Sequence, residues 1–218
     1  MKILKLIFFS LLLISFFSCK ETDDTPPRIT MNFADPINSN DSTGHVLNQP
    51  YVDPGATAWD DFDGDITASI YVNNPVNENR VGWYEITYDV VDQAGNEAPT
   101  TRRWLYVYNK AQSDSGSYNV FEQKLYPIAD TFQYQVNVYA DSLVNQRIVI
   151  MSLAGDLGQP IYGDVVDSLI VIPFQVAQYD SVNTYSIQGS GLINDSLIVL
   201  EYKKIDSLSS LWRSELKR

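Results

Sequence analysis

Apolar and polar residues alternate most clearly in residues 83–96, WYEITYDVVDQAGN. Every second position in the first part of this stretch is apolar: Tyr84, Ile86, Tyr88 and Val90. This period of two, rich in aromatic and β-branched residues, predicts a strand with one buried face. Gly95 and Asn96 tolerate a positive φ and therefore favour a turn. A second alternating run covers residues 100–108, so the pattern predicts a β-hairpin.

The rest of the first half has the same character. Three further runs have the composition of strands: residues 28–33, 45–52 and 66–72. Residues 53–55 and 60–65 are rich in Asp, Pro and Gly, which is typical of turns. Short strands separated by regularly spaced turns indicate an all-β sandwich, which we expect to span residues 26–109.

The second half begins after a polar stretch of small residues. Residues 110–117 have the composition of a flexible linker. Strand-like runs then recur to the end of the chain: residues 118–126, 132–139, 147–153, 168–176, 184–189 and 196–203. Because helical periodicity is absent before Leu208, residues 118–218 are predicted to form a C-terminal antiparallel β-sandwich or a small barrel. The expected fold class of the whole chain is all-β.

The N-terminus has the pattern of a secretory signal. Lys2 and Lys5 precede an apolar run, residues 6–17, that ends in Ser18 and Cys19. A basic start, a short apolar segment and a small residue before the cleavage point predict a signal peptide over residues 1–18. The apolar run is shorter than the ~20 residues that an ordinary membrane-spanning helix needs.

The cysteine directly after Ser18 makes this segment similar to a bacterial lipoprotein signal. The resemblance implies that Cys19 becomes the acylated first residue and that residues 19–25 form an acidic tether. The tract KETDD after the cysteine resembles that of surface-exposed lipoproteins of the Bacteroidetes. It implies a lipid-anchored protein of the outer membrane, exposed at the cell surface. The alternative is a secreted or membrane-anchored protein with an incidental cysteine.

Three ordered blocks of the first half resemble the bacterial immunoglobulin-like (Ig-like) modules of surface proteins and multidomain glycoside hydrolases. They are YVDPGATAWDDFDGDIT, VGWYEITYDVVDQAGNEA and TRRWLYVY, which begin at Tyr51, Val81 and Thr101. The resemblance implies an Ig-like β-sandwich that serves as a spacer or presentation module and carries no catalytic residues.

The aromatic residues of the hairpin depart from this family. Trp83, Trp104 and Tyr106 occupy positions that are commonly small or Thr-like in it. If Asp92 pairs with Glu97, Trp83 faces Tyr106 and all three rings point away from the core. Exposed aromatic clusters are typical of interaction sites. We therefore expect a ligand or interface platform. It could be a stacking surface for a sugar ring or peptide, a contact with the second domain or a partner, or chance exposure.

The acidic turn suggests a metal site. Asp61, Asp63 and Asp65 alternate around Gly64, and such carboxylates can converge on calcium. The segment is not an EF-hand, because the bidentate Glu and the flanking helices are missing. The alternative is a structural turn whose Asp side chains accept hydrogen bonds from backbone amides. Calcium is the only cofactor that the sequence suggests.

Charge and composition narrow the classes of function. The formal net charge of −12 argues against nucleic acid as a partner, because phosphate binding requires clustered Lys and Arg. With only one histidine, His45, and one cysteine, a Cys/His zinc site, a Cys–His dyad or a Ser-His-Asp triad is not expected. We therefore predict that the protein is not an enzyme. Glycoside hydrolysis by carboxylates alone is the remaining enzymatic alternative.

Two functional hypotheses follow for a non-catalytic outer-membrane lipoprotein. In the first, the protein is accessory to a TonB-dependent nutrient-uptake complex and presents its C-terminal β domain for the capture of glycan or peptide for the transporter. In the second, it is a structural or adhesion-type lipoprotein whose C-terminal β domain binds another protein. The first rests on analogy of domain layout rather than on an identified site.

Overall fold

The computed structural model describes residues 22–32, 42–153, 159–178, 183–194, 196–206 and 209–218. The predicted signal peptide and Cys19 lie outside these residues. Within the described ranges, no helix has both the length and the hydropathy needed to cross a membrane. The prediction of an all-β chain is confirmed, because every long element is a strand.

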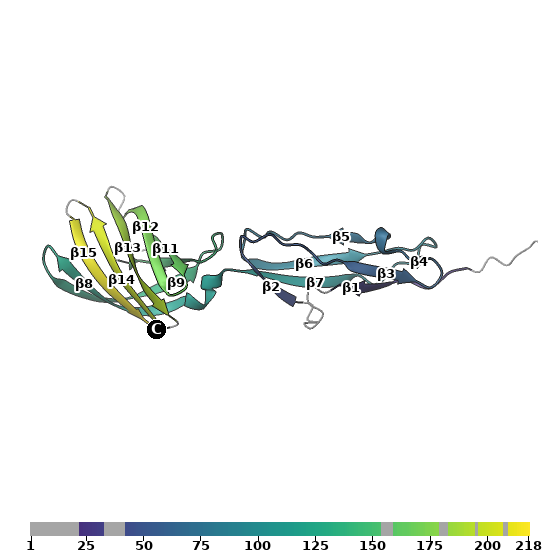
Figure 1. The fold of residues 1–218 in the computed structure, drawn as a ribbon, viewed down its shortest axis with the longest axis horizontal. Helices are drawn as coiled ribbons and strands as arrows, with labels where there is room; N and C mark the ends of the chain where they lie inside the picture. The colour runs from purple at the N-terminus through teal and green to yellow at the C-terminus, as the bar shows by residue number, and fades with distance from the viewer. Residues whose placement is uncertain (1–21, 33–41, 154–158, 179–182, 195, 207–208) are drawn as a thin grey trace, which may run out of the picture. The chain divides into compact units, whose positions relative to one another are not determined.

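The Ig-like region, which we define as residues 28–108, contains two sheets (Figure 1). The first has the order β1-β3-β4, with β1 Arg28–Met31, β3 Ala56–Asp60 and β4 Gly64–Asp65. The second has the order β2-β7-β6-β5, with β2 Ser42–Val46, β5 Tyr71–Asn73, β6 Gly82–Asp89 and β7 Thr101–Tyr108. Strand β2 runs parallel to β7, whereas β5 runs antiparallel to β6. A 3-10 turn, η1 Thr67–Ser69, precedes β5.

The predicted alternation of the hairpin strands is confirmed. Ile86, Tyr88, Leu105 and Val107 are buried, and Trp83 and Trp104 are exposed. The predicted pairing at the turn is wrong by one residue, because Glu97 pairs with Val91 instead of Asp92. The reason lies in the turn itself. The Asp92 carboxylate is buried and accepts hydrogen bonds from the Gly95 and Asn96 amides, so Asp92 belongs to the loop.

The C-terminal half is a closed antiparallel barrel with the order β10-β11-β12-β13-β14-β15-β8-β9 (Figure 1). Each strand pairs with the next along the chain, and β15 pairs with β8 to close the ring. Closure leaves no free sheet edge. Of the two architectures expected, the structure therefore has the barrel. Its strands are β8 Gly116–Tyr126, β9 Asp130–Ala140, β10 Arg147–Met151, β11 Pro160–Val166, β12 Leu169–Gln178, β13 Thr184–Asn194, β14 Leu197–Ile205 and β15 Ser209–Lys217.

Residues 110–117, the expected linker, contain the 3-10 helix η2 Lys110–Asp114 and the start of β8. The side chain of Asn109 begins η2 by accepting a hydrogen bond from the Ala111 amide at 2.9 Å. Its amide group also donates to the carbonyl oxygens of Asp141, Val144 and Arg147 at 2.8–3.0 Å. Asn109 is fully buried, so these bonds anchor the beginning of the barrel.

Inward-facing side chains fill the barrel. An eight-stranded barrel has an interior just wide enough for this. Six isoleucines are completely buried: Ile148, Ile150, Ile161, Ile170, Ile187 and Ile198. At Gly191 in β13, an added Cβ would lie 1.8 Å from the Val199 carbonyl oxygen of β14. Glycine is required there because the two backbones approach too closely for any side chain.

The barrel interior also holds one buried carboxylate, Glu122, which is 1% exposed. Its Oε1 accepts hydrogen bonds from the Tyr202 hydroxyl and from the Ser214 hydroxyl, the latter at 2.7 Å. Burial raises the pKa of Tyr202 well above its ordinary value, and the charge of Glu122 adds to the effect. Tyr202 therefore stays a neutral hydrogen-bond donor to the carboxylate.

Candidate functional site

The strongest candidate site is the outer side of β6 and β7, where aromatic rings lie exposed. We call Trp83, Trp104, Tyr106 and Tyr108 the aromatic face. Trp83 is 60% exposed and Trp104 is 44% exposed. The Trp83 and Tyr106 ring centroids are 4.9 Å apart with an interplanar angle of 30°, and Tyr106 stacks with Tyr108 at 6.4 Å and 19°.

Strand β2 extends this surface beyond β7. Gly44 of β2 pairs with Tyr106 of β7. A Cβ added at Gly44 would lie 3.1 Å from the Tyr108 ring, so the ring covers the backbone of the glycine. Three rings therefore follow one another, one on β6 and two along β7, and the last of them lies against β2 at Gly44. The carboxylate of Glu85, which is two residues along β6 from Trp83, shares the outward side of that strand.

The buried side of the same strands provides a firm support. Leu105 and Val107 pack with Leu47 in a small core, and Tyr84 contacts this core. Arg103 of β7 forms an ion pair with Asp53 at 3.4 Å, and both side chains are nearly buried. Buried side chains beneath the aromatic face support its strands, and a preorganised surface loses less conformational entropy when a ligand binds.

The structure does not bring the three predicted calcium ligands together. Asp63 Oδ2 accepts a hydrogen bond from the Gln93 amide at 2.8 Å. Asp65 Oδ1 accepts one from the Thr67 amide at 3.0 Å, and hydrogen bonds from Thr67 lower the pKa of Asp65. These two carboxylates have the structural turn role that was the alternative. Only Asp61 lies in a group of converging carboxylates.

That group consists of Asp23, Asp60 and Asp61, each of which offers a carboxylate oxygen within 4.8 Å of the others. The sequence pattern around the acidic turn did not indicate Asp23 or Asp60 as ligands. Asp60 is the last residue of β3 and precedes the predicted acidic turn, so its proximity to Asp61 was within reach of sequence reasoning. Asp23 is distant along the chain, and the sequence carries no signal that places it there.

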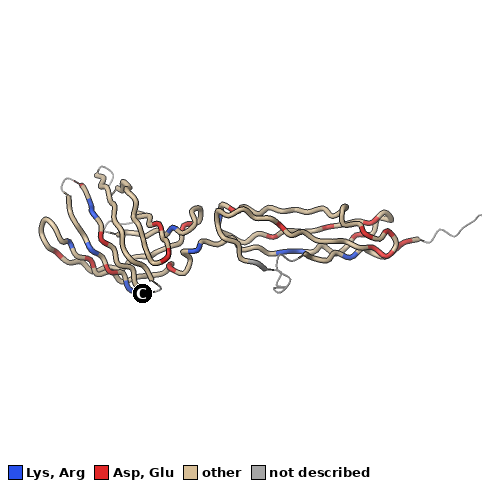
Figure 2. The backbone as a smooth tube through the Cα atoms, viewed as in Figure 1, with Lys and Arg blue, Asp and Glu red and all other residues tan. Residues whose placement is uncertain are grey.

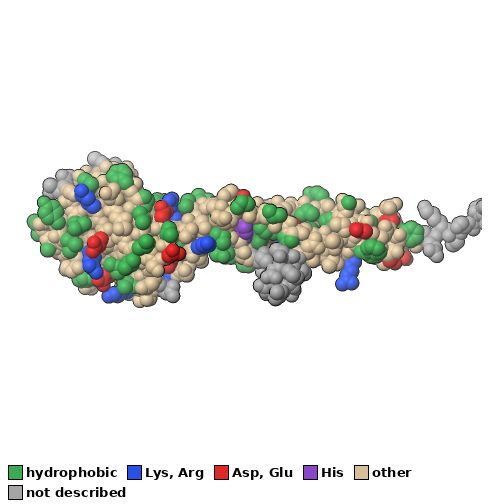
Figure 3. Space-filling view, in the orientation of Figure 1, with side chains coloured by type: hydrophobic (Ala, Val, Ile, Leu, Met, Phe, Trp, Pro, Cys, Tyr) green, Lys and Arg blue, Asp and Glu red, His purple; other side chains and the backbone are tan. Residues whose placement is uncertain are grey.

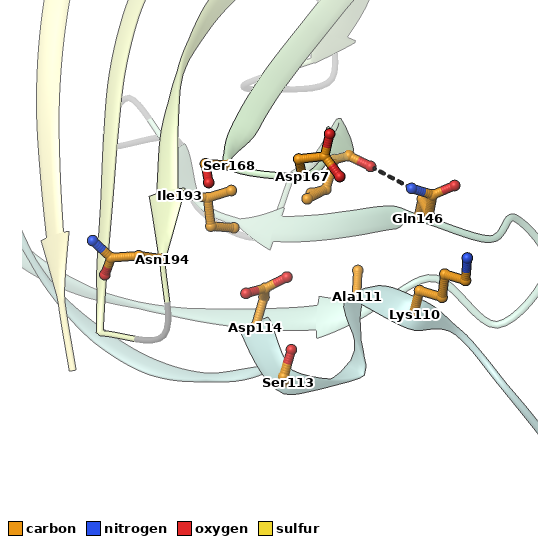
Figure 4. A pocket seen from close by; sticks show the side chains of 10 residues that line it. Lys110, Ala111, Ser113, Asp114, Gln146, Asp167, Ser168, Ile193 and Asn194 are labelled. Atoms are coloured by element: carbon orange, nitrogen blue, oxygen red, sulfur yellow. Dashed lines mark hydrogen bonds between the residues drawn. The ribbon is translucent and has the colours of Figure 1, made fainter.

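A second candidate is a pocket of about 430 Å³ at one end of the barrel. Figure 4 shows Asp114 of η2 pointing into the space beneath Ile193 and Asp167, with Ala111 between it and Lys110. Asp167 has a positive φ of 55° because it lies in the two-residue turn between β11 and β12. Mouths of barrels are common ligand sites, and the polar lining here suits a hydrated ligand. The sequence analysis did not identify this pocket.

Apolar side chains also lie on the outer surface of the barrel, and Figure 3 shows them in several separate patches. A groove of about 580 Å³ crosses Gly191, where β13 has no side chain, and Leu169, Val171 and Leu192 are exposed along it. Leu169 of β12 and Leu192 of β13 are cross-strand partners, so the exposed apolar side chains along the groove are neighbours.

The contacts of His45 indicate a structural role rather than a catalytic one. Its Nε2 lies 2.8 Å from the Gln49 carbonyl oxygen, and its ring packs edge-on against Tyr51 at 5.3 Å. Burial raises the pKa of Tyr51, and the charge of Asp53 adds to this. The part of the chain that the structure describes places no serine or cysteine nucleophile in a hydrogen bond with this histidine.

Comparison with known proteins confirms the Ig-like resemblance of the first half. A model of the family described as bacterial surface protein, Ig-like domain, matches residues 37–104, which is less than half of the chain. A search of curated proteins gave no match.

Two solved structures show a weak overall likeness. A lipoprotein from Bacteroides thetaiotaomicron is 18% identical with a TM-score of 0.39, over 88% of this chain and 100% of that chain. A structure of CBM51-2 in complex with GlcNAc and INT domains, from Clostridium perfringens ZmpB, is 15% identical with a TM-score of 0.30, over 88% of this chain and 44% of that chain. Both TM-scores are too low for either likeness to support an inference.

Proposed function

We propose that this protein is a non-catalytic surface lipoprotein that captures glycan at the aromatic face of its Ig-like region. In this proposal Cys19 carries the acyl anchor in the outer membrane, and the protein is accessory to a TonB-dependent nutrient-uptake complex. The match to an Ig-like family of bacterial surface proteins supports a location at the cell envelope.

The observation that carries the proposal is the pair of exposed tryptophans, Trp83 and Trp104, together with the half-buried rings of Tyr106 and Tyr108 that follow Trp83. Aromatic side chains are the largest contributors to contact area at binding surfaces, and they lose little conformational entropy on binding. The exposed Trp83 and Trp104 rings offer the apolar faces of sugar rings a place to stack. The neighbouring Glu85 carboxylate supplies an acceptor for sugar hydroxyls.

Peptide is a second ligand class for the same face, because aromatic residues are enriched at protein interfaces as well. The structural or adhesion-type alternative uses the face in this way, with another protein as the partner. Binding of a soluble polysaccharide by the aromatic face would indicate the glycan class, and binding of a peptide would indicate the peptide class.

Affinity electrophoresis in gels that contain soluble starch, xylan, mannan or mucin tests glycan capture. We expect at least one of these polymers to retard the protein, and Trp83→Ala and Trp104→Ala to abolish the retardation. Trp59→Ala is the matched control, because Trp59 is 63% exposed but belongs to β3 of the other sheet. Unchanged retardation in both aromatic-face variants, or no retardation of the wild type, would contradict glycan capture.

A pull-down with tagged, acylated protein from detergent-solubilised outer membranes tests the proposed assembly. The uptake proposal expects a TonB-dependent transporter to co-purify, and a Cys19→Ala variant to lose membrane association. Recovery of the lipoprotein without a transporter would favour the structural or adhesion-type alternative.

A further inference from the structure

Acidic residues gather at one end of the Ig-like region, around the turn after β3 and the loop after β6 (Figure 2). Three of them, Asp23, Asp60 and Asp61, direct carboxylate oxygens to within 4.8 Å of one another. Two of the three carry a buried oxygen that has no hydrogen-bond partner.

Asp60 is the central residue of this group. Its side chain is buried, with the residue 1% exposed, and its Oδ1 accepts hydrogen bonds from the Phe62 and Asp63 amides at 2.9 and 2.8 Å. Its Oδ2 is buried and accepts none. A buried carboxylate oxygen without a partner is costly, so something must compensate it in the folded protein.

Asp23, which lies far before Asp60 in the sequence, has one bonded and one unbonded carboxylate oxygen as well. Its Oδ1 accepts a hydrogen bond from the Thr25 amide at 3.1 Å, whereas its Oδ2 is buried and unpartnered. Asn96 holds the Asp23 backbone in position by donating its side-chain amide to the Asp23 carbonyl oxygen at 3.3 Å. The two unpartnered oxygens thus come from segments that other contacts already fix.

Positive charge does not compensate the group. Across the ranges given under Overall fold, no Lys, Arg or His forms an ion pair with Asp23, Asp60 or Asp61. The Thr25 hydrogen bond lowers the pKa of Asp23, but burial and the charges of Asp60, Asp92 and Asp61 outweigh it, so that pKa lies above its ordinary value. The negative charges therefore repel one another.

We propose that Asp23, Asp60 and Asp61 bind a divalent cation, and that the cation is calcium. All three ligands are carboxylate oxygens, which hard cations prefer, whereas zinc favours the nitrogen and sulfur of His and Cys. Calcium accepts six to eight oxygen ligands in flexible geometry, so water can complete its shell on the exposed side of Asp61.

The site would connect the lipid tether to the folded domain. Asp23 follows Cys19 by four residues, and Asp60 ends β3. A cation shared by these two side chains fixes the point where the chain leaves the tether and enters the Ig-like region. Calcium would therefore set how firmly the domain is held at its membrane-proximal end.

Isothermal titration of the full-length acylated protein in detergent with CaCl₂, after dialysis against EGTA and then buffer, tests the site. We expect one calcium per chain with a Kd of about 10⁻⁴–10⁻³ M, which is the range of extracellular calcium modules. Asp61→Asn should weaken binding at least tenfold. This variant should fold normally, because Asp61 is exposed and its carboxylate has no hydrogen bond with the part of the chain that the structure describes. Asp60→Asn, which keeps the Oδ1 acceptor, should have a similar effect.

Asp24→Asn is the matched control, because Asp24 is an exposed carboxylate next to Asp23 but outside the group. It should bind calcium as the wild type does. In thermal melts, 10-fold excess of CaCl₂ over Kd should raise the unfolding temperature of the wild type and of Asp24→Asn but not of Asp61→Asn. Absence of calcium binding to the wild type, or equal binding by Asp61→Asn and Asp24→Asn, would overturn the proposal.

Discussion

The barrel and the Ig-like region differ in the size of the apolar core that each of them buries. Among the described residues, the barrel buries one continuous cluster of 21 apolar residues. The Ig-like region has two small clusters of three buried residues each, which include Leu105 and Val90. Hydrophobic burial is the main favourable contribution to folding, so the barrel has the larger share of it.

Turns of the Ig-like region are held by hydrogen bonds between side chains and backbone. Asp60, Asp65 and Asp92 each accept bonds from amides in the turns that follow them. Asn109 and Asp141 have the same role in the barrel half, where they accept hydrogen bonds from the Ala111 and Leu143 amides. The two regions therefore differ in the size of their apolar cores rather than in how their turns are held. Variants in the core and in the turns separate these two sources of stability.

The largest effect is expected for Gly191→Ala in the barrel. The added Cβ would lie 1.8 Å from a backbone oxygen, so strands β13 and β14 must separate. We expect a loss of more than about 3 kcal/mol in the free energy of unfolding, measured by urea denaturation. The control is Gly95→Ala, in the loop after β6, which has a φ of 98° but free space around it. It should cost only the positive-φ strain, about 1–2 kcal/mol. Equal losses of unfolding free energy in the two variants would contradict a steric clash between β13 and β14 at residue 191.

Tyr202→Phe should have the next largest effect. It removes one of two hydroxyl donors from the buried Glu122 carboxylate, which should cost about 1–3 kcal/mol. The effect should depend on pH, because the pKa of Tyr202 is raised in the folded protein. Above a pH of about 10 the unfolded chain loses the Tyr202 proton while the folded chain keeps it, so stability falls as pH rises.

This alkaline loss should be smaller in Tyr202→Phe than in the wild type, as measured by chemical denaturation between neutral pH and pH ~11. Tyr139→Phe is the control, since Tyr139 is exposed on the outer side of the barrel. If stability fell with rising pH in the same way in all three proteins, the Glu122–Tyr202 pair would not be its cause.

A smaller effect is expected at the acid end for the Ig-like region. Burial raises the pKa of Asp92, but hydrogen bonds from Asn96, Gly95 and Ala94 outweigh it and hold that pKa below its ordinary value. The stabilisation by the charged form is therefore present above the pKa of the unfolded chain and is lost as pH falls through the folded pKa. Asp92→Asn should reduce this acid-dependent loss in thermal melts between neutral and acid pH. An unchanged acid limb would contradict the assigned role of the loop.

The smallest effect is expected for Trp83→Ala. Trp83 is 60% exposed and contacts Tyr106 at the surface, so its removal should change the free energy of unfolding by no more than about 0.5 kcal/mol. Urea denaturation of this variant beside Ile86→Ala, which removes a fully buried side chain of the same strand, makes the contrast direct. A large loss in Trp83→Ala would show that the aromatic face is part of the core.

Sequence reasoning succeeded where side-chain alternation decides the structure. The inward and outward positions of the hairpin around Ile86 and Leu105 follow directly from the period of two. It failed at the turn, where Asp92 bonds the loop amides and shifts the pairing by one residue. Alternation alone could not decide between sandwich and barrel, because closure depends on the pairing of β8 with β15, which are distant in sequence.

The candidate sites also differ in whether the local sequence pattern predicts them. The exposure of Trp83 and Trp104 follows from their strand positions, which the sequence reveals. The convergence of Asp23 with Asp60 depends on where the chain enters the domain, and local pattern contains no information on that. The polar pocket beside η2 was also beyond reach, since it is assembled from turns of several strands.

Oxidative footprinting of tryptophan in the presence and absence of the retarding polysaccharide tests the central claim most directly. The chain has four tryptophans, of which Trp59, Trp83 and Trp104 are exposed and Trp212 is largely buried. We predict that the polysaccharide protects Trp83 and Trp104 from oxidation and leaves Trp59 as reactive as before. Protection of Trp59 alone, or no change at Trp83 and Trp104 under conditions that retard the protein, would contradict glycan capture at the aromatic face.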